Sequence, residues 1–338
     1  MSKGFLPEKG SPDALDLARL YPTAPRDQLD IWANQYNFAN VDSFRRSIRK
    51  FYNLRRGTDT VRETIRKPVT SEPLIVRHQE ANVPLKLQTK YGNKTIAFIC
   101  DTHNPFQDEG TLSITERFLG ELQPDYLIYG GDVNDFYQVS VFDKNPARLD
   151  NLQNDLSNTQ GMFRRHRQML PNAHLILLEG NHEYRWTRFL WSSMAAAASL
   201  DCLTIDSLYN LKEYEIQHIN YEQGLMINGT FLALHGDIAS IHSGYTAKRL
   251  YAKHGGCGIA GHCHRGGSFY KRDRFGTWGW WEGFCLCRLN PDWMQNPNWV
   301  QGFSLIHFTD RTRFYVEQIP IIDHAFMYGG REYAVGED

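Results

Sequence analysis

Residues Thr95 to Asn104 have the sequence TIAFICDTHN, and the rest of the chain is organised around this stretch. Its apolar and β-branched residues run without a break into Asp101 and His103. A short, continuous run of this kind predicts a buried central strand rather than a helix. Because side chains of a strand alternate with period two, we expect Asp101 and His103 to point to the same side. Ligands of an open α/β sheet gather beyond the carboxyl ends of the strands, so this pair marks a candidate site.

Four later apolar stretches end in the same way, in residues that can bind a metal. They are Asp125–Tyr129 before GGDVND (130–135), His174–Leu178 before EGNHE (179–183), Thr230–Leu234 before HGD (235–237), and Gly258–Ala260 before GHCHR (261–265). Helical patterns at Ser113–Leu122 and Ala147–Leu170 separate the first three strands. Such alternation predicts an α/β sandwich whose strand ends converge on one site.

The side chains at these strand ends are carboxylates, an amide and several imidazoles. Mixed oxygen and nitrogen ligands suit manganese, iron or zinc better than calcium, and they suit a hydrolytic pair of ions roughly 3.5–4 Å apart. Glycines accompany these ligands and allow the backbone to turn sharply beside them. They are Gly131, Gly180, Gly236 and Gly261.

Taken in order, five motifs resemble those of the calcineurin-like metallophosphoesterase superfamily. They are Asp101-x-His103, Gly131-Asp132-x-x-Asp135, Gly180-Asn181-His182-Glu183, His235-Gly236 and Gly261-His262-x-His264. The resemblance covers about Thr95 to Gly267. It implies a four-layer α/β/β/α sandwich and a metal-dependent phosphoesterase that hydrolyses phosphate esters with a hydroxide bridging two divalent ions. Manganese is the expected metal, with iron or zinc as alternatives.

The same resemblance implies a role for each motif residue. The first metal would be held by Asp101, His103, Asp132 and His264. Asp132 would bridge to the second metal, which would be completed by Asn181, His235 and His262. His182 would protonate the leaving group as a general acid, with Asp135 orienting it. The histidines outside the motifs are expected to be structural.

Three arginines flank the motifs and are candidates for gripping phosphate oxygens: Arg185, Arg188 and Arg265. Surface salt bridges are the alternative for each of them. Protein phosphatases of the superfamily have an arginine directly after the last Asp of the second motif, where this chain has Phe136. This difference counts against a phosphoprotein substrate.

Two further stretches of the large domain have open interpretations. Tyr184–Gly229 resembles an insertion, and its helical part predicts either a substrate-selecting cap or a helix covering the sheet. Beyond Gly266, alternating patterns predict antiparallel strands that complete the second sheet. These patterns are Ser268–Arg272, Thr277–Arg288, Gln301–Phe308 and Arg313–Ile319. For Trp278, Trp280 and Trp281 we favour packing on the sheet over stacking on nucleobases.

The N-terminal residues 1–57 predict a small helical module. Its helical patterns are Asp13–Leu20, Arg26–Tyr36 and Asp42–Leu54, and a short corner between the last two favours a helix-turn-helix. Residues 41–67 contain nine basic and three acidic side chains, a net charge of +6. The third helix is therefore a candidate recognition helix that binds nucleic acid, most directly through Arg45, Arg46 and Arg49. The alternative is a solvated cationic face packed on the rest of the protein.

Residues 58–94 predict a linker containing one or two edge strands, and residues 95–330 the phosphoesterase domain. No signal peptide and no membrane-spanning segment is expected, and six cysteines without a zinc-site spacing suggest reduced thiols and a cytoplasmic protein. The basic helix favours a nucleic-acid phosphodiester as substrate, hence a nuclease. The alternatives are a phosphatase or phosphodiesterase of nucleotides or other small phosphate esters, and a non-catalytic nucleic-acid-binding protein.

Overall fold

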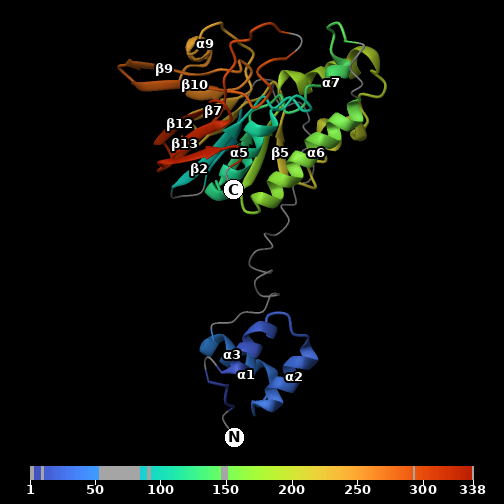
Figure 1. The fold of residues 1–338 in the computed structure, drawn as a ribbon, viewed down its shortest axis with the longest axis vertical. Coiled ribbons are helices and arrows are strands. Elements are labelled where there is room, and N and C mark those ends of the chain that lie inside the picture. Colours follow the sequence, from blue (N-terminus) through green and yellow to red (C-terminus); the bar gives the residue numbers. More distant parts are fainter. Residues whose placement is uncertain are drawn as a thin grey trace. The chain divides into compact units, whose positions relative to one another are not determined.

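The computed structural model describes residues 4–8, 11–52, 84–89, 93–145, 151–291 and 294–336. The described residues form two compact units, one up to residue 52 and one from residue 84 onward (Figure 1). Most of the stretch expected to be a linker, and the predicted end of the third helix at Leu54, lie outside these ranges.

The N-terminal unit contains three helices around its own apolar core. They are α1 (Pro12–Leu20), α2 (Arg26–Gln35) and α3 (Val41–Tyr52). Phe44 and Ile48, one turn apart on α3, are fully buried in this core. The side chain of Asn40 accepts a hydrogen bond from the Ser43 amide at 2.9 Å, so Asn40 caps α3. The charged face of α3 points away from this core, and Arg46 and Arg49 are exposed on it.

The second unit is built on two six-stranded sheets. The first has the order β12-β11-β2-β3-β4-β5, in which β2 to β5 are parallel and β11 and β12 are antiparallel additions at one edge. Its strands are β2 (Lys94–Ile99), β3 (Tyr126–Tyr129), β4 (His174–Leu178), β5 (Ile216–Ile219), β11 (Gln301–Phe308) and β12 (Phe314–Ile321). The strand β2, which the sequence predicted to be central, pairs with β11 on one side and β3 on the other.

The second sheet has the order β1-β6-β7-β8-β10-β9. Its strands are β1 (Leu85–Leu87), β6 (Leu225–Ile227), β7 (Phe231–Leu234), β8 (Cys257–Ala260), β9 (Gly266–Asp273) and β10 (Gly276–Gly283). The strand β1 pairs with β6 at one edge, as expected for an edge strand in that part of the chain, and β9 forms the opposite edge.

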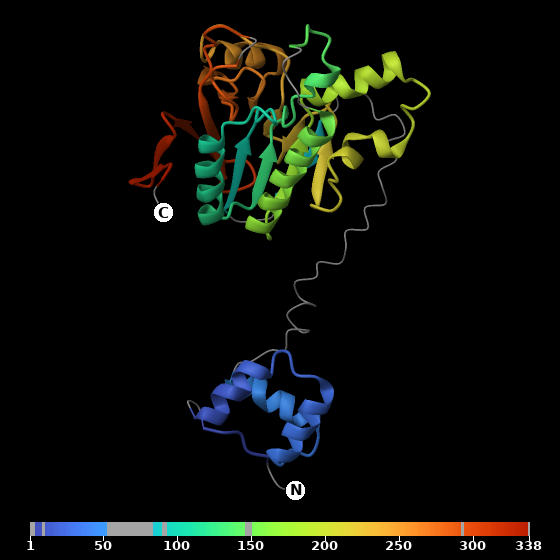
Figure 2. The ribbon, with the colours of Figure 1, turned by 45° about the vertical axis from the view of Figure 1, so that its right-hand side comes forward.

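Helices cover the outer face of each sheet, which gives the predicted four layers. Alternate side chains of β2 pack in opposite directions: Ala97 and Ile99 contact the helical layer, whereas Ile96 and Phe98 contact the other sheet. The helices on the first sheet are α5 (Glu109–Leu122), α6 (Leu152–Met169) and α7 (Asn181–Ser193). Figures 1 and 2 show α5 and α6 across the same face of this sheet. On the second sheet, α9 (Tyr245–His254) packs on β7 and β10.

The helix α7 begins the stretch Tyr184–Gly229 and is anchored in the core of this unit. Trp186 and Leu190 are buried in the core cluster of the first sheet and its helices, with the ring of Trp186 6.2 Å from that of Phe136 between centroids. Beyond α7 the chain forms two short helices, η2 (Asp201–Leu203) and α8 (Ile205–Leu208), and then β5 and β6, strands that the sequence patterns did not reveal. The helix α9 was also missed.

Several strand boundaries differ from their predictions. The strand β10 ends at Gly283 rather than at Arg288, because Phe284 adopts a left-handed backbone with φ of 67° that stops regular pairing. Trp280 and Trp281 are buried, which confirms that they pack in the sheet. Near the C-terminus a hairpin of β13 (Ala325–Tyr328) and β14 (Arg331–Ala334) packs Tyr333 into the helical layer of the core.

The cysteines are unpaired, and five of the six are buried as expected, whereas Cys202 is exposed. None of the helices in the described part of the chain is long and apolar enough to cross a membrane.

Candidate active site

The candidate ligands lie in loops directly after the carboxyl ends of β2, β3, β4, β7 and β8. Their backbones are unusual, because five of them have left-handed φ angles between 50° and 67°. These residues are Asp101, His103, Asp132, His262 and His264. Such conformations cost about 1–3 kcal/mol each in a non-glycine residue and persist only where the surroundings enforce them. The expectation that Asp101 and His103 sit on an extended strand is therefore wrong: β2 ends at Ile99, and left-handed turns aim both side chains.

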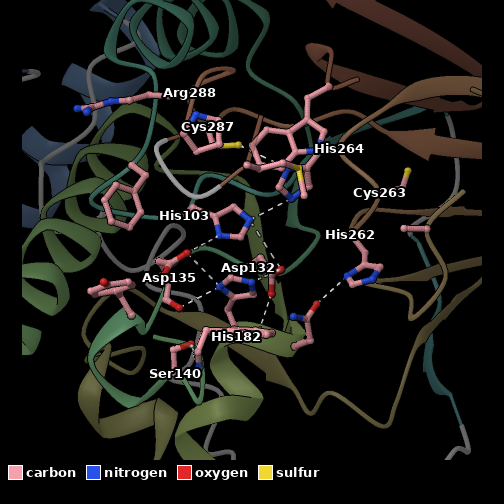
Figure 3. A pocket seen from close by; sticks show the side chains of 18 of the residues that line it. His103, Asp132, Asp135, Ser140, His182, His262, Cys263, His264, Cys287 and Arg288 are labelled. Atoms are coloured by element: carbon pink, nitrogen blue, oxygen red, sulfur yellow. Dashed lines mark hydrogen bonds and ion pairs between the residues drawn. The ribbon is translucent and has the colours of Figure 1, made fainter. Parts of the chain in front are cut away.

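One group of candidate ligands contains Asp101, His103 and His264. The Nε2 atoms of His103 and His264 lie 3.1 Å apart, and Nε2 of His264 lies 3.1 Å from Oδ1 of Asp101. All three side chains are buried, and they form one of the compact clusters of potential metal ligands. Figure 3 shows His103 between Asp135 on one side and His264 on the other.

The second group contains Asp132, Asn181, His235 and His262. Oδ1 of Asn181 lies 3.0 Å from Nε2 of His235 and 2.7 Å from Nδ1 of His262. Oδ2 of Asp132 lies 3.3 Å from Nε2 of His235 and 3.8 Å from Nε2 of His103, so this carboxylate stands between the two groups. The structure thus brings together all seven residues that the resemblance suggested as ligands.

These two groups fit divalent metal ions. Oδ1 of Asp101 is fully buried and accepts no hydrogen bond among the described residues, although a buried carboxylate oxygen normally does. Nδ1 of His235 donates to the main-chain oxygen of Gly130 at 2.8 Å, which leaves Nε2 directed at Asn181 and Asp132 in the cluster. A histidine whose second nitrogen donates to a carbonyl is the usual arrangement for a metal ligand.

The histidine proposed as general acid lies beside both groups. Nδ1 of His182 is 2.9 Å from the main-chain oxygen of Asp135 and 3.2 Å from its Oδ2. The same Oδ2 is 3.2 Å from Nδ1 of His103, so Asp135 orients both imidazoles. Arg185, one turn after His182 on α7, donates from Nη2 to Nε2 of His182 at 2.9 Å.

The carboxylates and imidazoles hold one another in charged forms. Burial alone would raise the pKa of Asp135, but hydrogen bonds from His103 and His182 hold it well below its usual value. Burial alone would lower the pKa of His235, but the charge of Asp132 raises it to about 9. His262 behaves differently, because burial and the nearby His235 lower its pKa to about 4. The aspartates of the cluster are therefore ionised, as ligands of a cation have to be.

Glu183 supports this cluster and was not assigned a role from the sequence. Its fully buried carboxylate accepts hydrogen bonds from the amides of Asp132, Val133 and Asn134 and from that of Gly180, at 2.8–3.0 Å. It also accepts one from the hydroxyl of Tyr209, at 2.9 Å. One side chain thus fixes the loop that carries Asp132. Its place at the end of the Gly-Asn-His-Glu motif was the one feature of the sequence that could have indicated this role.

Gly180 allows the loop after β4 to lie close to the loop that carries Asp132. A Cβ atom at this position would collide with both the carboxylate and the main-chain nitrogen of Asp132. The two strand ends can therefore meet only because residue 180 has no side chain.

A pocket of about 980 Å³ opens over these residues. Of the three arginines that flank the motifs, Arg185 and Arg265 line it, whereas Arg188 does not. The sequence did not single out the pocket residues Phe106, Tyr137, Cys287, Arg288 and Trp299. Sγ of Cys287 lies 3.7 Å from Nδ1 of His264, and the ring of Trp299 lies 4.3 Å from that of His264 between centroids. Cys287, Arg288 and Trp299 are brought in by the chain beyond β10, whereas Phe106 and Tyr137 closely follow the first and second motifs.

Comparison with known proteins gives the class of this site. The Metallophos family model, calcineurin-like phosphoesterase, matches residues 94–299. The Gene 54 proteins of Mycobacterium phages L5 and D29 are each 23% identical over 257 and 262 residues, covering 72% of this chain and 100% of each phage protein. A single mutant of Vps29 from Entamoeba histolytica superposes with a TM-score of 0.37 at 12% identity, covering 69% of this chain and 96% of that one. Vacuolar Protein Sorting 29 from Cryptosporidium parvum gives 0.35 at 9% identity, covering 72% and 95%.

The chain belongs to the calcineurin-like phosphoesterase family. It is accordingly a hydrolase acting on phosphoester bonds, and the family implies divalent metal ions. The resemblance seen in the five motifs is confirmed by the family match, which spans all of them.

Proposed function

We propose that this enzyme is a phosphodiesterase that cleaves nucleic acid, with two manganese ions held by the two groups of ligands. Asp101, His103 and His264 would hold one ion, Asn181, His235 and His262 the other, and Asp132 both. When bound, the ions would neutralise charge on the phosphate oxygens and lower the pKa of a water molecule. The convergence of these seven side chains, five of which line the pocket, is the observation that carries the proposal.

The protein's own groups would do the remaining work. Arg185 and Arg265 line the pocket and can bind phosphate oxygens, orienting the ester. His182 would give a proton to the oxygen of the leaving group, with Asp135 holding the imidazole in place. The buried position of the aspartates excludes bulk water from the side of the site that faces the protein.

The basic helix α3 favours nucleic acid over a small ester. Arg46, Arg49 and Lys50 are exposed on this helix, while its apolar residues Phe44 and Ile48 are buried in the three-helix core. A short helix pair with such a cationic face is typical of DNA-binding modules. The alternative substrate, a nucleotide or other small phosphate ester, would need the pocket alone.

Hydrolysis of a chromogenic phosphodiester beside the matching monoester tests the proposal. Each would be assayed with added Mn²⁺, after chelation, and with competing DNA. We expect metal-dependent cleavage of the diester that DNA inhibits. Preference for the monoester without inhibition by DNA would support the small-ester alternative. Absence of activity with any divalent metal would support the non-catalytic binding protein.

A variant with Arg45, Arg46 and Arg49 changed to Ala tests the N-terminal module separately. It should bind DNA more weakly and with a smaller salt dependence, because each lost phosphate contact reduces the slope by about 0.9. Its hydrolysis of the small diester should match that of the unchanged protein. Unaltered DNA affinity across several salt concentrations would exclude the module as a DNA-binding element.

A further inference from the structure

A second basic region lies within the phosphoesterase unit itself. Residues 244–276, which form α9, β8 and β9, contain seven lysines and arginines but one acidic residue, a net charge of +6 in a chain whose total is −1. Six of these cations are exposed, and the four of them that do not bind Asp237, Ala239 or Ser240 are called the basic strip. They are Lys248, Lys271, Arg272 and Arg274. Strong local charge of one sign on a nearly neutral chain favours a charged partner.

The strand β9 connects the candidate active site to the basic strip, three of whose four cations lie at or just beyond its far end. The strand β9 begins at Gly266, directly after Arg265, which lines the pocket. It is an edge strand of eight residues and runs about 26 Å away from that point at roughly 3.3 Å per residue. In Figure 1, β9 and β10 extend outward beside α9. A chain bound along this edge would have one end at the pocket.

The cations of the basic strip are available to a partner. None of the four forms an ion pair with a carboxylate in the described part of the chain. By contrast, Lys253 on the same helix is paired with Asp237 at 2.6 Å. Clustered cations without ion-pair partners are the electrostatic footprint of a site that binds a phosphate backbone.

A hollow of about 580 Å³ lies between α9 and β9 and contains both charge and aromatic rings. Lys248 and Lys271 line it together with Tyr251 and Phe269, whose ring centroids are 5.6 Å apart. Nζ of Lys271 lies 5.2 Å from the centroid of Tyr251. Cations beside aromatic rings can bind a phosphate and a base together.

Large aromatic side chains are exposed near the strip. Tyr270 is 60% exposed and Phe275 is 75% exposed, one within β9 and one in the turn that follows it. Exposed rings beside cations are suited to stacking on unpaired bases, whose flat faces are free, whereas the faces of bases in a duplex are covered. This combination favours a single strand over a duplex.

We propose that the basic strip binds single-stranded nucleic acid and leads it into the active-site pocket. Only the second part, that the bound nucleic acid leads into the pocket, rests on the phosphodiesterase function proposed above. Binding along the strip requires neither metal nor catalysis, so it is testable apart from that function. It also differs from a role of α3, which belongs to the other unit.

The test uses the full-length protein with Lys271→Glu and Arg272→Glu combined. Binding of a fluorescent thymidine oligonucleotide is measured in EDTA at several salt concentrations. We expect at least about a tenfold loss of affinity at low salt and a salt slope smaller by about 1.4, since each single-strand phosphate contact contributes about 0.7. The matched control is Lys86→Glu with Lys212→Glu, two exposed lysines outside the strip, which should bind as the unchanged protein does.

Two further measurements complete the test. Changing Tyr270 and Phe275 to Ala should weaken binding of the single strand more than binding of a duplex of the same length. Hydrolysis of the small chromogenic diester should stay unchanged in both strip variants, which separates this proposal from the catalytic one. Unaltered affinity in the charge-reversal variant, an equal loss in the lysine control, an equal loss of duplex and single-strand binding in the Tyr270 and Phe275 variant, or equal binding of anionic lipid vesicles would each overturn it.

Discussion

Arg185 donates a hydrogen bond from Nη2 to Nε2 of His182, at 2.9 Å. Nδ1 of the same imidazole lies 2.9 Å from the main-chain oxygen of Asp135, to which it donates. An imidazole that donates at Nδ1 and accepts at Nε2 is neutral and has no proton at Nε2 to give. Arg185 therefore has to leave Nε2, for example to bind a phosphate, and Nε2 has to take up a proton from water before His182 can act as an acid toward a substrate.

Changing His182 to Ala should lower turnover of a phosphodiester by about 10²–10⁴-fold, the usual contribution of a general acid. Metal content should stay the same, because His182 is not among the proposed ligands. Elemental analysis of the purified variant beside its steady-state kinetics checks both parts. Loss of both metals together would show that His182 is a ligand, and His242→Ala, an exposed histidine outside the pocket, serves as the control.

Changing Arg185 to Ala should reduce kcat/KM about 10–100-fold, since a hydrogen bond to a charged group contributes about 1.5–3 kcal/mol. Arg185→Lys should restore part of this, because lysine keeps the charge but cannot bind two oxygens in one plane. The control is Arg188→Ala, three residues further along α7 and outside the pocket. Equal kinetics for the Arg185 and Arg188 variants would contradict a role of Arg185 in binding phosphate.

The two arginines illustrate how far the sequence allows the site to be predicted. The motif residues could be assigned in advance because each follows a short apolar strand, and parallel strands bring such ends to one edge of the sheet. Arg185 and Arg188 could not be distinguished, because only the rotation of α7 decides which one faces the pocket. That rotation is set by the burial of Trp186 and Leu190, a tertiary contact.

The same limit explains which elements were missed. The strands β5 and β6 have four and three residues, so they are too short to show a period, and β6 has its place only because it pairs with β1 and β7. Trp299 and Cys287 reach His264 through the chain after β10, where a left-handed Phe284 redirects the backbone. Local patterns predict strands and their ends, whereas contacts across the sandwich depend on the assembled fold.

Changing Glu183 to Gln should destabilise the protein and weaken metal binding. The glutamine side chain would place an NH₂ group where five groups now donate to the carboxylate. These are four main-chain amides and the Tyr209 hydroxyl. One or more of them would lose its acceptor, at a cost of about 1–3 kcal/mol for each unsatisfied group. Tyr209→Phe removes one of these bonds and should cost only about 1 kcal/mol. Urea unfolding and metal titration of both variants would check this, and equal stability of the two would argue against Glu183 as the support of the Asp132 loop.

Changing Glu116 to Gln should produce a pH-dependent loss of stability far from the site. Glu116 on α5 lies 2.8 Å from Nη2 of Arg165 and 3.0 Å from Nε2 of His166, both on α6. Burial alone would raise the pKa of Glu116, but His166, and after it Arg165, lower it below its usual value of 4.5. The ionised carboxylate thus stabilises the fold above the pKa of the unfolded chain, and this stabilisation is lost as the pH falls through the lower, folded-state pKa.

The difference in unfolding free energy between the unchanged protein and the Glu116→Gln variant should therefore be largest, about 1–2 kcal/mol, at neutral pH. It should remain constant down to about pH 5 and shrink below that, because protonation then removes the same charge from the unchanged protein. Urea unfolding at about pH 7, 5 and 4 measures this difference. A difference that grows as the pH falls would contradict the charge-based contact between α5 and α6.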